Sequence, residues 1–154
     1  DFLTLGSSIS LCLLEGVWLT QKEVLAGDHV FLTGAGSGIG RMMAVRFGKL
    51  GCNLSLSDIN VAGLEKTKQE CLAEGIPADR IYTFSSMSPQ DKIADAAVAV
   101  KAKFGTVSVL VNNAGIVSAK QTTDLSDQMI ERTFAVNTLS HFYTIKEFLP
   151  AMIE

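Results

Sequence analysis

From residue 28 onward, two patterns of hydrophobic and polar positions alternate along the chain, one typical of strands and one typical of helices. Short apolar runs ending at glycine or polar residues predict buried strands, and apolar residues three or four positions apart predict helices. The expected strands are residues 29–33, 53–57, 80–84 and 107–111. The expected helices are residues 39–50, 61–73, 89–104 and 126–150. The apolar side of the first helix is expected to consist of Ile39, Met42, Met43, Phe47 and Leu50, with Arg46 at the same spacing. Strands alternating with helices predict a parallel sheet covered on both faces.

The domain organisation follows from the same pattern. Residues 28–154 are expected to form one α/β domain with a Rossmann-like, doubly wound parallel sheet, truncated after about four of about six strands. Residues 1–27 form a separate apolar segment, in which eleven of the eighteen residues 2–19 are apolar and Glu15 is the single charge. A spanning helix needs about 20 apolar residues. Membrane contact and packing on the domain both remain open for this segment. Because the sequence begins at Asp1, we expect a fragment.

Composition and charge exclude several classes of protein. Of 154 residues, 47% are apolar and 19% are charged, which excludes a disordered chain. The net charge is −3 without a basic block, which argues against a nucleic-acid partner. Cys12, Cys52 and Cys71 are widely spaced and form no CxxC pair. They indicate neither a metal site nor a disulfide framework, and buried thiols in a reducing, intracellular compartment are expected.

A glycine-rich loop connects the first strand to the first helix. The run Thr33–Gly40 reads TGAGSGIG and places glycines in a GxxxGxG spacing. Glycines allow a tight turn and a close approach of the backbone to a pyrophosphate. The helix N-terminus adds unpaired N–H groups and a partial positive charge. A plain glycine-rich turn is the alternative. The predicted cofactor-binding residues of this loop are Gly34, Ser37, Gly38, Ile39 and Gly40.

An acidic residue ends the second strand. Asp58 lies eighteen residues after Gly40, near the spacing of about 20 expected for a carboxylate that binds the adenosine ribose. A carboxylate accepts the ribose hydroxyls and repels the extra phosphate of NADP. The neighbouring positions Ala35, Ser37 and Ile59 carry no positive charge to hold that phosphate. The predicted cofactor is therefore NAD, and a helix N-cap is the alternative role of Asp58.

Three motifs in order now resemble the short-chain dehydrogenase/reductase family. They are TGxxxGIG at the loop, NNAG at residues 112–115, and an asparagine in the last helix, Asn137. The residues around these motifs resemble those of the membrane-associated branch that acts on retinoids and hydroxysteroids. The resemblance implies that Asn113, Ala114 and Gly115 contact the cofactor.

The resemblance also implies an Asn-Ser-Tyr-Lys catalytic tetrad. Asn137 matches its asparagine, which in the family fixes a helix kink and a water of the proton relay. A solvent-facing polar residue is the alternative, but Phe134, Val136 and Phe142 nearby indicate a packed neighbourhood. The other three members have no match.

Two neighbours of Asn137 do not complete the tetrad. Tyr143 and Lys146 are spaced YxxK rather than YxxxK, and they are expected to be ordinary helix residues, as is His141. Ser86 stands where the family commonly has an acid that contacts the adenine. The 154-residue chain alone is therefore expected to be inactive.

The expected function is that of an NAD-dependent oxidoreductase interconverting an alcohol and a carbonyl on a lipid-like substrate, of retinoid or steroid type. The alternative is a catalytically inactive nucleotide-binding or interaction module. The resemblance further implies a homodimer of the full-length protein through the long helix, and a location inside the cell at the endoplasmic reticulum membrane or a lipid droplet.

Overall fold

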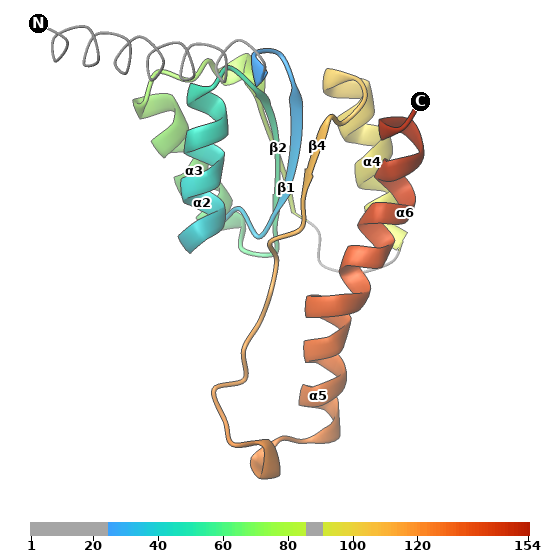
Figure 1. Cartoon of the computed structure of the whole chain (residues 1–154). Coiled ribbons are helices and arrows are strands. Elements are labelled where there is room, and N and C mark those ends of the chain that lie inside the picture. The colour runs from blue at the N-terminus through green and yellow to red at the C-terminus, as the bar shows by residue number, and fades with distance from the viewer. Residues whose placement is uncertain (1–24, 86–90) are drawn as a thin grey trace, which may run out of the picture.

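A four-stranded parallel sheet forms the centre of the molecule (Figure 1). In the computed structural model, residues 25–85 and 91–154 are described. The strand order is β3-β2-β1-β4, and each of the three pairings is parallel. The strands are β1 (His29–Thr33), β2 (Asn53–Asp58), β3 (Ile81–Ser85) and β4 (Val109–Val111). The Rossmann-like class of fold is confirmed.

Helices cover both faces of this sheet (Figure 1). One face carries α2 (Gly38–Lys49) and α3 (Val61–Ala73). The other face carries α4 (Asp91–Phe104) and α6 (Ser140–Met152). Short 3-10 helices span Ala78–Arg80 and Thr122–Asp124. Since consecutive parallel strands need a crossover, α2, α3 and α4 each return the chain to the start of the next strand.

The core beneath α2 and α3 is larger than the one beneath α4 and α6. Its buried members are Val30, Leu32, Ala35, Ala44, Cys52, Leu54, Leu56, Leu64, Cys71, Ile76 and Ile81. The second core consists of Phe31, Val100, Val107 and Phe148. Its centre is the Phe31 ring, 4.3 Å from the Phe148 ring.

The buried face of α2 agrees with the predicted one only in part. Met43 and Phe47, and Leu50 directly after the helix, pack against the larger core as expected, whereas Ile39 and Met42 are both 65% exposed. The fully buried positions are the unpredicted Gly40, Ala44 and Gly48. The reason is a close approach of the helix to the segments around it. A Cβ at Gly48 would collide with the Ile76 side chain, so only small residues fit between this helix and its neighbours.

A buried histidine fastens the amino ends of the central strands. His29 Nε2 lies 2.7 Å from the Ser55 hydroxyl, and Nδ1 lies 3.0 Å from the Gly105 carbonyl oxygen. Burial lowers the pKa of His29 below its ordinary value. The neutral ring therefore joins β1, β2 and the end of α4.

Two of the three cysteines lie in the described part of the chain. Cys52 and Cys71 are free and buried, and burial raises the pKa of the Cys71 thiol to about 11. Among the described residues, no group of His, Cys, Asp and Glu side chains could hold a metal ion.

The last predicted helix is three consecutive segments instead of one. It begins as α5 (Asp127–Phe134), continues as a π-helix (Ala135–Leu139) and ends as α6. The expected stop at Pro150 is also wrong, because α6 includes Pro150 and continues to Met152. Because a proline has no backbone N–H, position 150 cannot donate the helical hydrogen bond to the Lys146 carbonyl.

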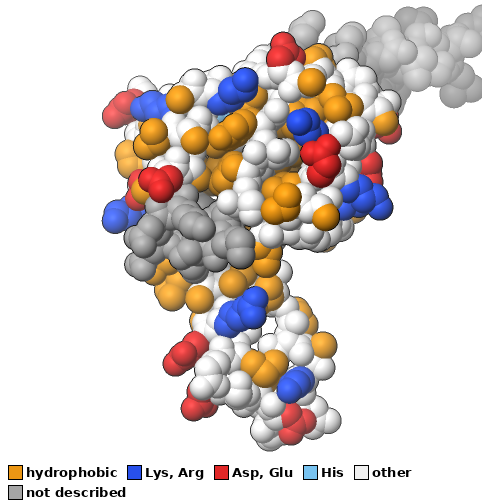
Figure 2. Space-filling model, turned by 180° about the vertical axis from the view of Figure 1, so that it is seen from behind, with side chains coloured by type: hydrophobic (Ala, Val, Ile, Leu, Met, Phe, Trp, Pro, Cys, Tyr) orange, Lys and Arg blue, Asp and Glu red, His pale blue; other side chains and the backbone are white. Residues whose placement is uncertain are grey.

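The segment from the end of β4 to α5 forms a narrow lobe beyond the sheet (Figure 1). Figure 2 shows this lobe below the wider body, with apolar and charged side chains mixed on its surface. Helices long and apolar enough to cross a membrane are absent from residues 25–85 and 91–154. The predictions for residues 2–19, Ser86 and the helix start near Ser88 lie outside the described residues.

Candidate cofactor-binding site

The glycine loop runs from the carboxyl end of β1 to the first turn of α2. Gly34 has a φ of +67°, and a Cβ there would lie 2.9 Å from the Ala114 Cα. A Cβ at Gly40 would collide with the Gly34 carbonyl group. Side chains are therefore excluded at these two positions, and the loop folds tightly against the end of β4.

The N-terminus of α2 is open. Its N-cap residue, Ser37, makes no side-chain capping bond, and no acidic residue lies in the first turn. Ser37, Gly38 and Ile39 are exposed. Unpaired N–H groups at an uncapped helix start attract an anion, and the helix dipole adds to this attraction.

Asp58 lies beside this loop at the end of β2. Its Oδ2 accepts a hydrogen bond of 2.8 Å from the Gly36 N–H. Its Oδ1 accepts one of 2.9 Å from the Asn60 N–H. Each carboxylate oxygen has a further lone pair, so Asp58 can still accept hydroxyl donors from a ligand. The helix N-cap of α3 is Asn60, which accepts from Gly63 N–H, so the alternative role is filled by another residue.

The segment after β4 is bonded to the start of the glycine loop. The Asn113 side-chain amide donates to the Thr33 carbonyl at 3.0 Å and to the Gly34 carbonyl at 3.2 Å. The Thr33 hydroxyl accepts the backbone N–H groups of Asn113 and Ala114, both at 3.0 Å. These bonds hold β4 and the loop as one unit.

Asn137 occupies the middle of the π-helix. Its Oδ1 accepts from the Ile116 N–H at 2.8 Å, and its Nδ2 donates to the Ile116 carbonyl at 2.9 Å. The packed neighbourhood expected from Phe134, Val136 and Phe142 is wrong for both phenylalanines, which are 62% and 65% exposed, while Val136 is half-buried. Asn137 is fixed instead by this pair of backbone bonds.

One cavity of about 770 Å³ connects these parts. It extends from the glycine loop and Asp58 across Phe31 and Phe84 to the first turn of α6. The predicted residues that line it are Gly34, Ser37, Gly38, Ile39, Gly40, Asp58, Asn113, Ala114 and Gly115. Asn137 does not line it directly, but its neighbours Ala135 and Val136 do. A volume of this size fits an elongated organic ligand.

The residues of α6 that could imitate a catalytic pair lie elsewhere. The residues lining the cavity include Ser140 and Thr144 but neither Tyr143 nor Lys146. His141 also does not line it. Its Nε2 is the buried side-chain nitrogen without a hydrogen-bond partner among the described residues.

Sequence reasoning missed three polar residues that support the site. Thr33 joins the loop to Asn113 and Ala114. The Thr144 hydroxyl donates to the Asn112 side chain at 2.7 Å and thereby ties α6 to the end of β4. Arg41 contacts the loop from behind. None of the three occupies a glycine or asparagine position of the motifs. Threonine and arginine are also common residue types, so no spacing rule singled them out.

The model of the short chain dehydrogenase family matches residues 28–154, and the chain belongs to this family of oxidoreductases. Estradiol 17-beta-dehydrogenase 11 of Macaca fascicularis is 43% identical over 159 residues, covering 100% of this chain and 52% of the relative. Epidermal retinol dehydrogenase 2 of Homo sapiens is 40% identical over 157 residues, covering 99% of this chain and 50% of the relative. The resemblance to the retinol and hydroxysteroid branch is confirmed. The chain spans about half the length of these relatives.

Solved structures lead to the same family. A short-chain dehydrogenase/reductase from Brucella melitensis, a glucose/ribitol dehydrogenase, has a TM-score of 0.74 and 34% identity over 82% of this chain and 52% of that chain. One from Burkholderia phymatum, in complex with NAD, has a TM-score of 0.76 and 28% identity over 83% of this chain and 45% of that chain. A metagenomic short-chain oxidoreductase in complex with NADP has a TM-score of 0.75 and 30% identity over 83% of this chain and 57% of that chain. Both nicotinamide dinucleotides thus occur among similar folds.

Proposed function

We propose that the chain binds NAD rather than NADP and belongs to an oxidoreductase that interconverts an alcohol and a carbonyl on a lipid-like substrate. The observation that carries the proposal is Asp58 beside the uncapped start of α2 in one cavity. The names of the relatives, an estradiol and a retinol dehydrogenase, support a substrate of steroid or retinoid type.

The residues present fit such a dinucleotide. The open N-terminus of α2 offers N–H groups to a pyrophosphate, and Asp58 offers carboxylate oxygens to the adenosine ribose. The Asn113 side chain bonds the segment after β4 to the start of the glycine loop and so fixes this part of the cavity lining. When bound, the cofactor supplies the hydride chemistry. The protein's contribution in this chain is to bind, orient and exclude water.

The preference for NAD is testable by titrating the purified chain with NAD and NADP. Asp58 should repel the 2′-phosphate and accept the 2′-hydroxyl, so NAD is expected to bind more tightly. Asp58→Ala removes both effects and should narrow the gap between the two affinities. Tighter binding of NADP by the unaltered chain would overturn the preference.

We propose in addition that the 154-residue chain alone does not turn over an alcohol. No YxxxK occurs in the sequence, and a positioned general base contributes a factor of about 10²–10⁴. The test combines purified chain, NAD and a panel of retinol and steroid alcohols, followed by absorbance of the reduced cofactor. Turnover that Tyr143→Phe abolishes would show that α6 carries its own base.

The second candidate is a catalytically inactive nucleotide-binding module. The position of Tyr143 and Lys146 away from the cavity lining favours it for this chain. The two candidates differ in one observation on the native transcript. A continuation past Glu154 with a strand ending in serine and then YxxxK supports the enzyme. A transcript that stops there supports the module.

Self-association and location complete the proposal. The apolar side chains exposed along the helical segments α5 to α6 are Ile130, Phe134, Leu139, Phe142, Ile145, Leu149 and Ile153. Such a stripe supports a homodimer of the full-length protein, which sedimentation would detect.

Membrane contact through residues 1–27, at the endoplasmic reticulum or a lipid droplet, is tested by liposome flotation of the chain with and without residues 1–20. Equal flotation of both would contradict it.

A further inference from the structure

The Gly36 backbone is held from two sides. Its N–H donates to Asp58 Oδ2 at 2.8 Å, and its carbonyl accepts from Arg41 Nη2 at 2.5 Å. Gly36 is buried, and a Cβ there would lie 2.9 Å from the Asp58 Cγ. The peptide planes on either side of Gly36 therefore have charged partners that fix their orientation.

Arg41 makes its other bonds to α3. Its Nε donates to the Thr67 hydroxyl at 3.1 Å, and its Nη1 forms an ion pair of 3.3 Å with Glu70 Oε1. Thr67 is fully buried and donates onward to the Ala35 carbonyl at 2.7 Å. The guanidinium thus anchors two consecutive loop carbonyls, directly and through Thr67, on the side facing α3.

The orientation of these carbonyls determines where the next N–H group points. The carbonyl and the N–H of one trans peptide point in opposite directions. Because the Gly36 carbonyl is turned toward Arg41, the N–H of Ser37 points away from it. Ser37 lines the cavity and begins α2 without a capping bond from its own side chain. Arg41 therefore acts on the open helix start through the Gly36–Ser37 peptide.

We propose that Arg41 is a positioning residue for the phosphates of the dinucleotide, an inference that rests on the proposed function. Its guanidinium orients the Gly36–Ser37 peptide so that the N–H groups of the loop face the anion. Arg41 is committed to Gly36, Thr67 and Glu70, so its contribution to binding is made through the backbone. Neither the glycine spacing nor Asp58 assigns this role.

Arginine suits this position better than lysine. Three acceptors in different directions are served by a planar group with a fixed fork of donors, whereas a lysine ammonium is a point charge on a flexible stem. Arg41→Lys therefore keeps the positive charge and loses the simultaneous bonds to Gly36 and Thr67. This difference separates an orienting role from simple attraction of a phosphate.

The test compares ADP with adenosine as ligands of the purified chain, by NMR titration. The variants are Arg41→Met and Arg41→Lys. Arg41→Met is expected to weaken ADP binding by about tenfold or more, the effect of losing one charge-assisted hydrogen bond. Arg41→Lys is expected to lose most of the same affinity. Adenosine lacks the phosphates, and its affinity is expected to change less than about twofold in both variants.

Lys49→Met is the matched control. Lys49 forms an ion pair of 2.6 Å with Glu74, which also joins α2 to α3 but lies away from the loop. Its loss should leave both affinities unchanged. Equal losses for ADP and adenosine in Arg41→Met would overturn the proposal in favour of a general structural role. Full ADP affinity in Arg41→Lys would overturn it in favour of charge attraction.

A second readout needs no ligand. The amide signals of Ser37 and Gly38 in the free protein should move in Arg41→Met and Arg41→Lys but not in Lys49→Met. Unmoved signals would overturn the orienting role. Thr67→Val provides a further variant, because it removes the link to Ala35 and keeps Arg41. Failure of the unaltered chain to bind ADP or NAD would refute the proposed function, whereas unmoved loop signals refute only this inference.

Discussion

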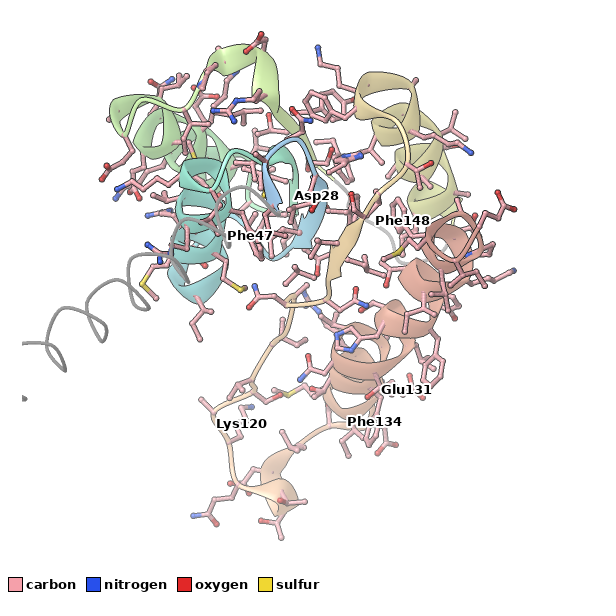
Figure 3. The ribbon with its side chains drawn as sticks, turned by 45° about the horizontal axis from the view of Figure 1, so that its top comes forward. Asp28, Phe47, Lys120, Glu131, Phe134 and Phe148 are labelled. Carbon is pink, nitrogen blue, oxygen red and sulfur yellow. The ribbon has the colours of Figure 1, made fainter. Side chains whose placement is uncertain are left out.

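The two sides of the sheet differ in how completely they are packed. The cradle, which we define as β1, the glycine loop, α2, β2 and α3, contains Leu54 and Leu56 fully buried on one strand. The arm, which we define as residues 112–154, contains two buried side chains, Thr144 and Phe148. In Figure 3, Phe148 lies near the sheet, while Glu131 and Phe134 lie on the lobe opposite Lys120. The cradle is held by the larger apolar core, whereas the arm is attached by Phe148 in the smaller core and by hydrogen bonds such as that between Thr144 and Asn112.

The largest expected effect is in the cradle core. Leu56→Ala should lower the free energy of unfolding by about 2–5 kcal/mol, since it leaves a cavity in a close-packed site. Leu149→Ala in the arm removes the same atoms from a side chain that is 43% exposed, and it should cost less than about 1 kcal/mol. Urea unfolding followed by circular dichroism measures both. Equal costs would remove the distinction between cradle and arm.

The arm depends on Asn137. Asn137→Ala leaves the N–H and carbonyl of Ile116 without their partners. Because both bonds are only partly buried, water can replace them in part, and the cost should lie at or below the lower end of the range of about 1–3 kcal/mol for a buried unsatisfied group. The loss should be local. Hydrogen exchange of the Ile116 amide should accelerate, while amides of β2 stay protected. Thr138→Ala, at the exposed neighbouring position of the π-helix, is the matched control. Acceleration across β2 as well would show that cradle and arm unfold together.

A smaller, pH-dependent effect comes from His29. Burial lowers its pKa below 6.5 in the folded state, so the unfolded chain takes up a proton first as the pH falls. The stability that the neutral His29 ring contributes is fully present above about pH 6.5. It declines as the pH falls from there toward the pKa of the folded state, by at most about 1.4 kcal/mol per pH unit. Urea unfolding between pH 7.5 and 5.5 measures the decline. His29→Gln should flatten it, and an unchanged slope would assign the decline to other groups.

The smallest expected effect is at the surface of the cradle. Lys49 and Glu74 form their ion pair with side chains that are 44% and 50% exposed. Exposed pairs contribute about 0–1 kcal/mol, so Lys49→Met should change the unfolding midpoint little. High salt should lower even this difference. A cost comparable to that of Leu56→Ala would mean that charge rather than burial stabilises the cradle.

The order of the elements could be predicted from the sequence, because the periods of 2 and 3.6 are clear in β2 and α3. The face of α2 could be predicted only in part. Met43 and Phe47 pack against the core as predicted. The fully buried residues, however, are glycine and alanine, and hydrophobic patterning favours the larger Ile39 and Met42, which are exposed.

Some residues of the candidate site could likewise be predicted from the sequence, and others could not. Asp58 and the glycines could be proposed from the sequence because their spacing matches that of a dinucleotide-binding motif. Arg41 and Thr144 act through backbone and side-chain contacts between segments far apart in the chain. Such contacts become visible only once the elements are packed. Asn137 was proposed from the family resemblance, but its bond to the Ile116 backbone could not be predicted from the sequence.

The π-helix at Ala135–Leu139 has a consequence for insertions and deletions. A π turn accommodates one residue more than an α turn, and each residue of an α-helix advances the direction of side chains by about 100°. Loss of one residue from this segment would therefore convert the π turn into an α turn and leave the direction of the side chains after it nearly unchanged. Thr144 and Phe148 would still face Asn112 and Phe31, their partners at the sheet. Loss of one residue from the first turn of α6, by contrast, would turn both side chains away from the sheet by about 100°. A deletion is therefore expected to be tolerated better at these five positions than in α6.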